Sequence, residues 1–182
     1  MSASNPVARY GRLSIALHWL MVLLIAGVYA TIELKGNFPK GSEPRELLKQ
    51  WHFMLGLTIF GLVWLRLIAR LLNPAPGAVA GAAGWETALA KLVHLALYGL
   101  MIGLPLLGWL TLSAAGKPIP FFGLELPALI GADKALAGEI KEIHETLAVA
   151  GYWLIGLHAV AALFHHYVRR DDVLKRMLPQ RP

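Results

Sequence analysis

The sequence predicts an all-α integral membrane protein, a four-helix bundle with both termini in the cytoplasm. Of its 182 residues, 57% are hydrophobic and 15% are charged, whereas an average soluble domain has about 45–50% and about 25%. Four apolar stretches are each long enough to cross a bilayer, which takes roughly 20 helical residues. Lys and Arg are shared unequally between the two ends of these stretches. We therefore expect one membrane-embedded domain, residues 1–182, that contacts lipid and not nucleic acid.

The four predicted spans cover residues 13–32, 51–69, 92–115 and 146–168. Their interiors are apolar without the alternation typical of a strand. Turn-forming residues separate them at 36–44, 73–77 and 117–120, and the loop 116–140 has room for a small helix but not for a domain. A signal peptide is the competing interpretation of the first span. Because this span exceeds the usual apolar core of about 7–15 residues and contains His18, we interpret it as retained.

The basic residues set the predicted orientation. The side with the N-terminus, the second loop and the C-terminus, which includes Arg181, carries ten Lys and Arg against three Asp and Glu. The opposite side carries seven against eight. Because Lys and Arg accumulate in cytoplasmic loops, both termini should be cytoplasmic.

The chain contains seven histidines and no cysteine. The lack of cysteine excludes disulfides, thiolate-bound iron–sulfur clusters and haem attached through Cys-x-x-Cys-His. Histidine inside a membrane span is costly and indicates a functional site by default. A single histidine can equally bond a helix carbonyl or face headgroups, so the inference rests on their joint arrangement.

The histidines of the spans fall into two layers. His52 and His144 lie near the outer surface, and His18 and His158 lie deeper on the cytoplasmic side. His144 and His158 are 14 residues apart, so on one helix they are separated by about 21 Å and differ by about 40° in direction. Both therefore face the same bundle interior.

Two glycines occur close to these histidines. Gly151 lies midway between His144 and His158, and Gly56 lies four residues after His52. Because glycine has no side chain, we expect each to let a bulky planar group lie against the helix backbone.

Two pairs of imidazoles at two depths suit two haem groups. We predict that His52 and His144 bind the outer haem and that His18 and His158 bind the inner one. Without cysteine both would be noncovalent b-type haems, and two axial nitrogens favour electron transfer over oxygen binding. A divalent-metal carrier is an alternative, but its sites usually include carboxylates, and none lies within a span interior.

Four segments of the chain carry a family resemblance, in the right order. They are Ile15-Ala16-Leu17-His18-Trp19-Leu20, Trp51-His52, His144-Glu145-Thr146-Leu147-Ala148, and Gly156-Leu157-His158-Ala159-Val160-Ala161-Ala162-Leu163-Phe164-His165-His166-Tyr167. Together they resemble the bacterial cytochrome b561 family over nearly the whole chain. The resemblance implies a four-helix protein of the bacterial inner membrane with His18, His52, His144 and His158 as the haem iron ligands.

The resemblance also implies an activity. It is greatest toward the superoxide oxidases of enteric bacteria, which pass electrons from superoxide to ubiquinone. We therefore expect a superoxide:ubiquinone oxidoreductase. The alternative is a cytochrome b subunit that relays electrons from a protein partner to quinone, as in dehydrogenases and hydrogenases of the wider family.

The cytoplasmic end offers residues for quinone. His94 and His165 or His166 should converge below the inner haem, where an imidazole can donate a proton near neutral pH. Tyr98 follows His94 by one helical turn on the same face and is a candidate for lining the site. We interpret His166 as a polar interfacial anchor.

Cationic side chains are candidates for binding anions at both ends. Lys49, just before His52, and Lys117 could steer superoxide toward the outer haem, or could anchor the loops to headgroups. Arg66, together with Arg70, suits either haem propionates or lipid phosphates.

Overall fold

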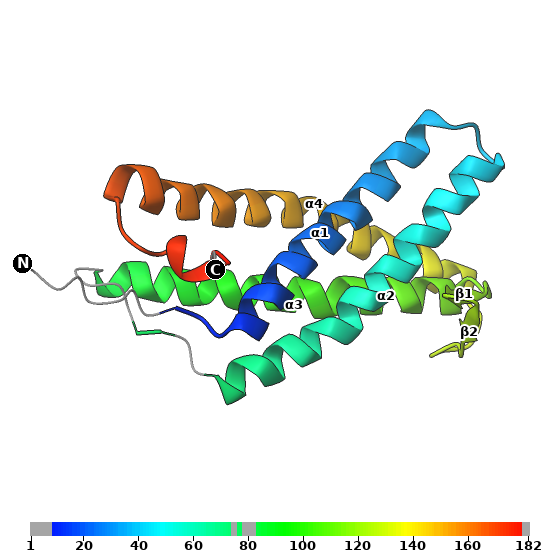
Figure 1. Cartoon of the computed structure of the whole chain (residues 1–182). Helices are drawn as coiled ribbons and strands as arrows, with labels where there is room; N and C mark the ends of the chain where they lie inside the picture. The colour runs from blue at the N-terminus through cyan, green and yellow to red at the C-terminus, as the bar shows by residue number, and fades with distance from the viewer. Residues whose placement is uncertain (1–8, 74–75, 78–82, 180–182) are drawn as a thin grey trace, which may run out of the picture.

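The computed structural model describes residues 9–73, 76–77 and 83–179, so Pro74, Ala75 and Arg181 lie outside the described residues. Four long helices dominate it: α1 (Arg12–Leu34), α2 (Glu43–Leu72), α3 (Gly84–Ala114) and α4 (Lys134–Phe164) (Figure 1). Each is long and apolar enough to cross a membrane, in agreement with the predicted four-helix membrane fold. We call the end of the bundle where Tyr10 bonds Arg176 the inner end, following the predicted orientation.

The helices extend beyond the apolar stretches that predicted them. α2 begins at Glu43 and α4 at Lys134, so both start with polar turns that a hydropathy pattern does not detect. Asp133 caps α4, because its Oδ1 accepts the backbone N–H groups of Ala135 at 2.9 Å and Leu136 at 3.1 Å. This cap satisfies two of the N–H groups that a helix start leaves free.

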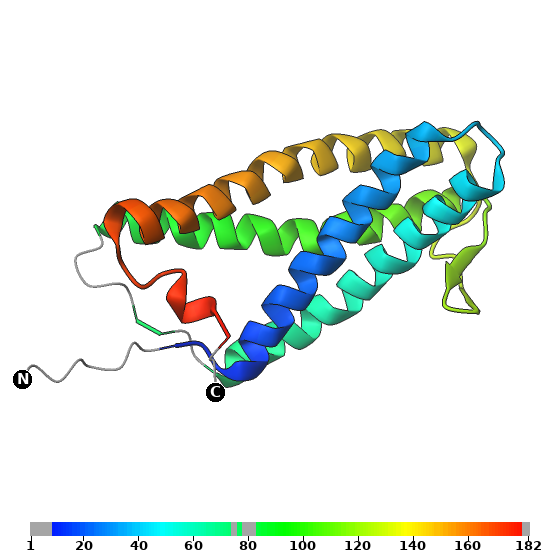
Figure 2. The same cartoon turned by 45° about the horizontal axis from the view of Figure 1, so that its top comes forward.

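The helices pack as two antiparallel pairs. α1 lies against α2 and α3 against α4, while α2 joins the pairs through α3. Figure 2 shows the pairs diverging toward the inner end. A small core of Met21, Ile59 and Val63 lies where α1, α2 and α3 meet. Large apolar side chains cover the periphery of the bundle along its length. Examples are Leu71 and Trp153, at 81% and 79% exposure, as expected where the surrounding solvent is lipid.

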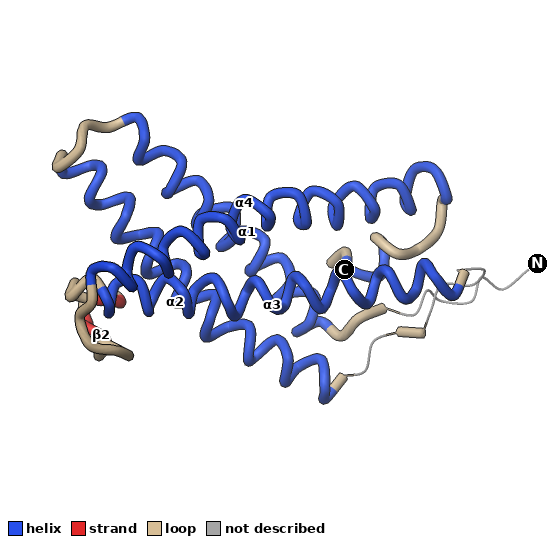
Figure 3. Tube along the Cα trace, turned by 180° about the vertical axis from the view of Figure 1, so that it is seen from behind, coloured by secondary structure: helices blue, strands red, loops and turns tan. Residues whose placement is uncertain are grey.

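The loop between α3 and α4 holds a β-hairpin in place of the small helix for which the sequence left room. Strands β1 (Ile119–Phe121) and β2 (Leu124–Leu126) pair antiparallel. The connecting Phe122 and Gly123 both have positive φ, 46° and 86°, as in a two-residue type I′ turn. The Phe122 ring lies 6.2 Å from that of Trp51. The hairpin therefore packs against α2 at Trp51, one residue before His52, and Figure 3 shows it at the end of α3.

The C-terminal segment folds back across the inner end. After α4 come a π-helical turn, η2 (His165–Arg169), and a short 3-10 helix, η3 (Lys175–Met177). The indole N–H of Trp19 donates to the Met177 carbonyl at 2.8 Å, and the backbone N–H of Tyr10 donates to the Arg176 carbonyl at 3.3 Å. These bonds hold the segment between the two diverging helix pairs (Figure 2).

Candidate functional site

The outer pair of histidines joins α2 to α4. The ring centroids of His52 and His144 are 6.2 Å apart, with an angle of 75° between the ring planes. His52 lies one residue after Trp51, which contacts Phe122 of the hairpin, and His144 lies in the outer half of α4. Both side chains are half-buried.

Neighbouring helices fix the orientation of both outer rings. The Nδ1 of His52 lies 3.0 Å from the carbonyl oxygen of Val28 on α1, and the Nδ1 of His144 lies 2.9 Å from that of Leu104 on α3. Because a carbonyl can only accept, each Nδ1 carries the hydrogen and donates it. The neutral tautomer then leaves Nε2 free as a metal ligand, which is the usual arrangement of a metal-binding histidine.

The inner histidines form a group of three. The ring centroids of His18 on α1 and His158 on α4 are 6.3 Å apart at 76°. His94 on α3 packs against the other side of the group, 5.4 Å from His158. All three rings are half-buried, so one imidazole from each of three helices meets at this depth.

Two arginines of α2 complete the inner group. Arg66 donates to the Nδ1 of His18 and to the hydroxyl oxygen of Tyr98, both at 3.1 Å. The guanidinium carbons of Arg66 and Arg70 lie 5.8 and 5.9 Å from the Tyr98 ring centroid. Among the described residues neither arginine forms a salt bridge. The group therefore carries two positive charges suited to an anionic substituent.

The spacing of both pairs fits one metal ion between two imidazoles. A first-row metal ion bonds an imidazole nitrogen at about 2.0 Å, so two rings on opposite sides of one ion have centroids about 6 Å apart. The observed 6.2 and 6.3 Å match this value. At the inner pair, ligation through Nε2 needs the hydrogen on Nδ1, which excludes the Arg66–His18 hydrogen bond. Arg66 would then be free to pair with a carboxylate.

The two glycines near the histidines differ in their surroundings. A Cβ on Gly56 would meet no atom within 4 Å, which leaves room beside His52. At Gly151 the structure corrects the expectation, because a Cβ there would collide with the hydroxyl of Tyr29. That hydroxyl donates to the Ala148 carbonyl at 2.8 Å. A phenol from α1 therefore covers the backbone that we expected a planar group to approach.

The residues predicted to bind quinone are placed in two groups. His94 and Tyr98 both belong to the inner group around His158 and Arg66. His165 lies seven residues beyond His158 and bonds Asp171, Nδ1 to Oδ2, at 2.5 Å. In the part of the chain that the structure describes, no direct ring contact joins His94 to His165, so their convergence below the inner group stays a prediction. The Nδ1 of His166 is buried without a hydrogen-bond partner among those residues.

The two lysines predicted to steer an anion differ in their pairing. Lys49 lies 2.5 Å from Glu46 on the preceding turn of α2, so much of its charge is balanced. Lys117 is exposed just after α3 and forms no salt bridge with any described residue. Of the two, Lys117 is the better placed to attract an anion.

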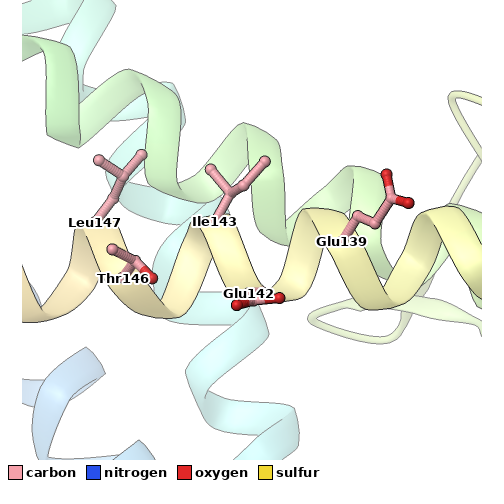
Figure 4. Close-up of a pocket in the computed structure, with 5 residues that line it drawn as sticks. All are labelled: Glu139, Glu142, Ile143, Thr146 and Leu147. Atoms are coloured by element: carbon pink, nitrogen blue, oxygen red, sulfur yellow. The ribbon is translucent and has the colours of Figure 1, made fainter.

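A hollow of about 350 Å³ lies on the outer half of α4. Its lining residues all come from that helix: Glu139, Glu142, Ile143, Thr146 and Leu147 (Figure 4). They surround His144 in sequence, but the hollow includes none of the seven histidines. We do not assign it to the histidine site.

The structure adds site residues that the sequence argument missed. The carbonyls of Val28 and Leu104 orient the rings of the outer histidine pair, but a backbone carbonyl has no signature in the sequence. Asp171 was counted only as a surface charge, although its position six residues after His165, past the end of α4, is a signal for a pair across the helix terminus. Tyr29 could have been found from its match in depth to Gly151.

These features define a class: a four-helix membrane protein with two histidine pairs spaced for metal coordination at two depths. Residues 9–180 match the family model of prokaryotic cytochrome b561. The chain belongs to this family, as the sequence resemblance predicted. Membership implies electron transfer in a membrane and the binding of haem b, an iron porphyrin.

Curated relatives match the chain over nearly its whole length. It is 39% identical over 173 residues to "Cytochrome b561 homolog 1" of Escherichia coli K12, covering 95% of this chain and 98% of the relative. It is 38% identical over 173 residues to "Probable superoxide oxidase CybB" of Yersinia pestis, covering 95% and 97%. A "Cytochrome b562" of Cereibacter sphaeroides is 31% identical over 176 residues, covering 94% and 96%.

Proposed function

We propose that this protein is a di-haem b oxidoreductase that transfers electrons from superoxide at the outer side of the bacterial inner membrane to ubiquinone. The observation that carries the proposal is the pair of matched histidine couples, with centroids 6.2 and 6.3 Å apart. Their ligands on α4 are separated by about 21 Å. This spacing suits an electron path across most of the apolar layer. Both termini would lie in the cytoplasm, as the distribution of Lys and Arg indicates.

The residues that would hold the haems follow from the geometry. His52 and His144 would bind the outer iron, and His18 and His158 the inner one. A haem iron held by two imidazoles would supply reversible one-electron transfer. The chain contributes the orientation of the ligands through Val28 and Leu104. Arg66, released from His18, would pair with an inner haem propionate, because a guanidinium binds a carboxylate in a bidentate manner.

Superoxide as the donor is supported by the relative named as a probable superoxide oxidase and by the outer surface. Among the described residues, the connections at the outer end are a short loop and a small hairpin. No large domain therefore covers the end of the bundle near His52 in the described structure. Lys117 is an exposed cation at this end, and local positive charge raises the encounter rate of a small anion. Lys49, paired with Glu46 at 2.5 Å, would contribute less.

Quinone as the acceptor is supported by polar groups at the inner end. His94, His165 and Tyr98 are the candidates for binding it, and each offers a hydrogen bond to a quinone oxygen. The diverging helix pairs and the C-terminal segment surround this region (Figure 2). Reduction of a quinone also consumes protons, which the cytoplasm would supply.

Stopped-flow mixing with superoxide tests the proposal. The purified, haem-loaded protein is mixed with superoxide alone and then with superoxide and ubiquinone. We expect rapid haem reduction in the first experiment and quinol formation in the second. Haem reduction no faster than that of an unrelated bis-histidine cytochrome would refute the assignment of the donor.

A relay subunit for a protein partner is the second candidate function. Exposed apolar residues on the outer side favour it, because Phe122 and Leu124 of the hairpin are 54% and 67% exposed. Co-purification of a stable dehydrogenase or hydrogenase subunit would support this function over superoxide oxidation. For the metal-carrier alternative, the three inner histidines and the other described His, Asp and Glu residues do not form a group of three arranged to hold one metal ion.

A further inference from the structure

The end of α4 forms a histidine–carboxylate pair outside the haem-ligand set. His165 begins the turn η2, and Arg170 then takes the left-handed conformation, with φ 54° and ψ 33°, which is uncommon outside glycine. This step reverses the chain, so the Asp171 N–H donates to the His165 carbonyl at 3.1 Å. The same reversal sets Oδ2 of Asp171 2.5 Å from Nδ1 of His165.

The carboxylate of this pair is itself held in place. Its Oδ1 accepts the backbone N–H of Val173 at 3.0 Å. Burial acts to raise the pKa of Asp171, but the hydrogen bonds from His165 and Val173 outweigh it and hold the pKa below its usual 3.8. Asp171 is thus an anion at neutral pH and accepts a hydrogen from Nδ1. The opposite ring nitrogen, Nε2, is the one that can exchange a proton with another molecule.

The charges around the pair are largely balanced. Arg169 forms a salt bridge with Glu86 of α3. Arg169 also interacts electrostatically with Asp171, and Glu86 does so with His165. On the following turn Asp172 pairs with Lys175 at 3.0 Å. Asp171 is therefore the anion bonded to His165, while Asp172 is an otherwise similar carboxylate one residue away.

The position of the pair links the inner group to the aqueous side. His165 follows His158 by seven residues, which places it on the same helix face about 10 Å closer to the inner end. The side chains of His165 and Asp171 are 25% and 18% exposed, so water can reach them. The bond from Trp19 to the Met177 carbonyl keeps the segment that carries Asp171 in this place.

We propose that His165 and Asp171 form the proton-transfer pair for quinone reduction, with His165 exchanging the proton through Nε2 and Asp171 acting as its positioning residue. This inference rests on the proposed function. Two superoxide ions become two dioxygen molecules and release two electrons, and one quinone takes up these electrons with two protons to form quinol. His165 donates each proton to a quinone oxygen and regains one from water. Asp171 fixes the ring and stabilises the imidazolium between transfers, as carboxylates do for catalytic histidines.

The reverse reaction gives a test that needs no superoxide. The full-length, haem-loaded protein is mixed anaerobically with a soluble ubiquinol, and haem reduction is followed by absorbance across the pH range in which histidine titrates. In this direction His165 is the base, so the rate should rise with pH as the imidazolium loses its proton. In Asp171→Asn the plateau should fall about ten-fold, because a positioned base contributes at least this much.

Three variants complete the test. Asp172→Asn, the matched control, should keep the wild-type plateau and rise. Asp171→Glu should restore most of the plateau, and His165→Gln should abolish the rise while both haems stay bound. A profile of Asp171→Asn that matches the wild type overturns the proposal, and so does a loss in Asp171→Glu as large as in Asp171→Asn, which would mark a structural role alone. If Asp171→Asn does not fold, Asp171→Glu and His165→Gln decide by the same criteria.

Failure of the proposed function gives a different pattern. If the quinol experiment behaves as expected but superoxide alone does not reduce the haems, the donor is wrong and the proton-transfer pair stands. If quinol does not reduce the haems of the wild-type protein, the assignment of quinone is wrong and the pair falls with it.

Discussion

The Nδ1 of His144 donates to the carbonyl oxygen of Leu104 at 2.9 Å, so α3, which contributes no ring to the outer pair, fixes the orientation of one of its rings. Val28 of α1 does the same for His52 at 3.0 Å. All four helices thus contribute to the outer pair. α2 and α4 provide the imidazole rings, and α1 and α3 provide the carbonyls that bond them. Because these bonds already fix the ring planes, binding a metal ion between the rings would cost less side-chain conformational entropy.

Replacing one outer histidine should remove one haem. In His52→Ala or His144→Ala we expect the pyridine haemochrome count to fall from two to one per chain, because a single axial ligand binds haem weakly. The reduced-minus-oxidised spectrum should keep the low-spin bands of the inner haem. His166→Ala, which removes a histidine outside the pairs, is the control and should keep both. Loss of both haems from either outer variant would contradict the pairing.

Replacing Arg66 should weaken the inner haem selectively. A charge-assisted hydrogen bond contributes about 1.5–3 kcal/mol, so Arg66→Leu should lower the affinity for the inner haem roughly 10- to 100-fold. Arg66→Lys should recover part of this, because it keeps the charge without the planar fork. Haem titration of the apoprotein measures the effect. Arg12→Leu, which removes an exposed cation of the same inner end, serves as the control, and an equal loss in that variant would rule out a specific contact.

The space beside Gly56 can be tested by filling it. A Cβ at Gly56 would meet no atom within 4 Å, so Gly56→Leu should place its side chain in the open space beside α2, where it competes with a haem next to His52. We expect lower outer-haem occupancy with an unchanged thermal midpoint of the apoprotein. Gly61 is the matched control, because it is equally open but lies on the opposite face of α2 from His52. Equal haem occupancy in both variants would argue against a haem at this face.

The sequence alone predicts the parts of this molecule that depend on hydropathy and helical periodicity. The four spans follow from the length of their apolar runs, and the shared direction of His144 and His158 follows from their 14-residue spacing. The first turns of α2 and α4 escape such a prediction because polar residues form them. The hairpin escapes it as well, since Pro118 and Pro120 conceal a short strand, and its turn depends on the positive φ of Phe122 and Gly123.

The missed parts of the site depend on contacts between distant segments. The pairing of Asp171 with His165 needs the left-handed step at Arg170, which few side chains signal. The contact of Tyr29 with Gly151 needs the crossing of α1 and α4. The spacing of Asp171 from His165 and the matching depth of Tyr29 and Gly151 indicate that these contacts are possible, but only the placement of the helices in space shows that they form.

The Asp171 pair predicts how acid affects the C-terminal segment. The folded-state pKa of Asp171 lies below its usual 3.8, because the bonds from His165 and Val173 outweigh the effect of burial. A carboxylate whose pKa is lowered on folding adds stability above its unfolded pKa and loses it as the pH falls through the folded value. The segment after α4 should therefore be held firmly at neutral pH and loosen below about pH 4.

Limited proteolysis at a series of pH values, with an acid-tolerant protease, measures this loosening. At pH 5 to about 7 we expect Asp171→Asn to be cut after α4 faster than the wild-type protein, because the variant lacks the ionised carboxylate. As the pH falls below the folded pKa of Asp171 the two proteins should converge, since protonation removes the same charge from the wild type. Asp172→Asn should follow the wild type at every pH, because Asp172 makes no bond to His165. Equal cleavage of Asp171→Asn and the wild type at neutral pH would mean that the bond to His165 does not hold this segment, and that the contacts of Trp19 with Met177 and of Tyr10 with Arg176 suffice.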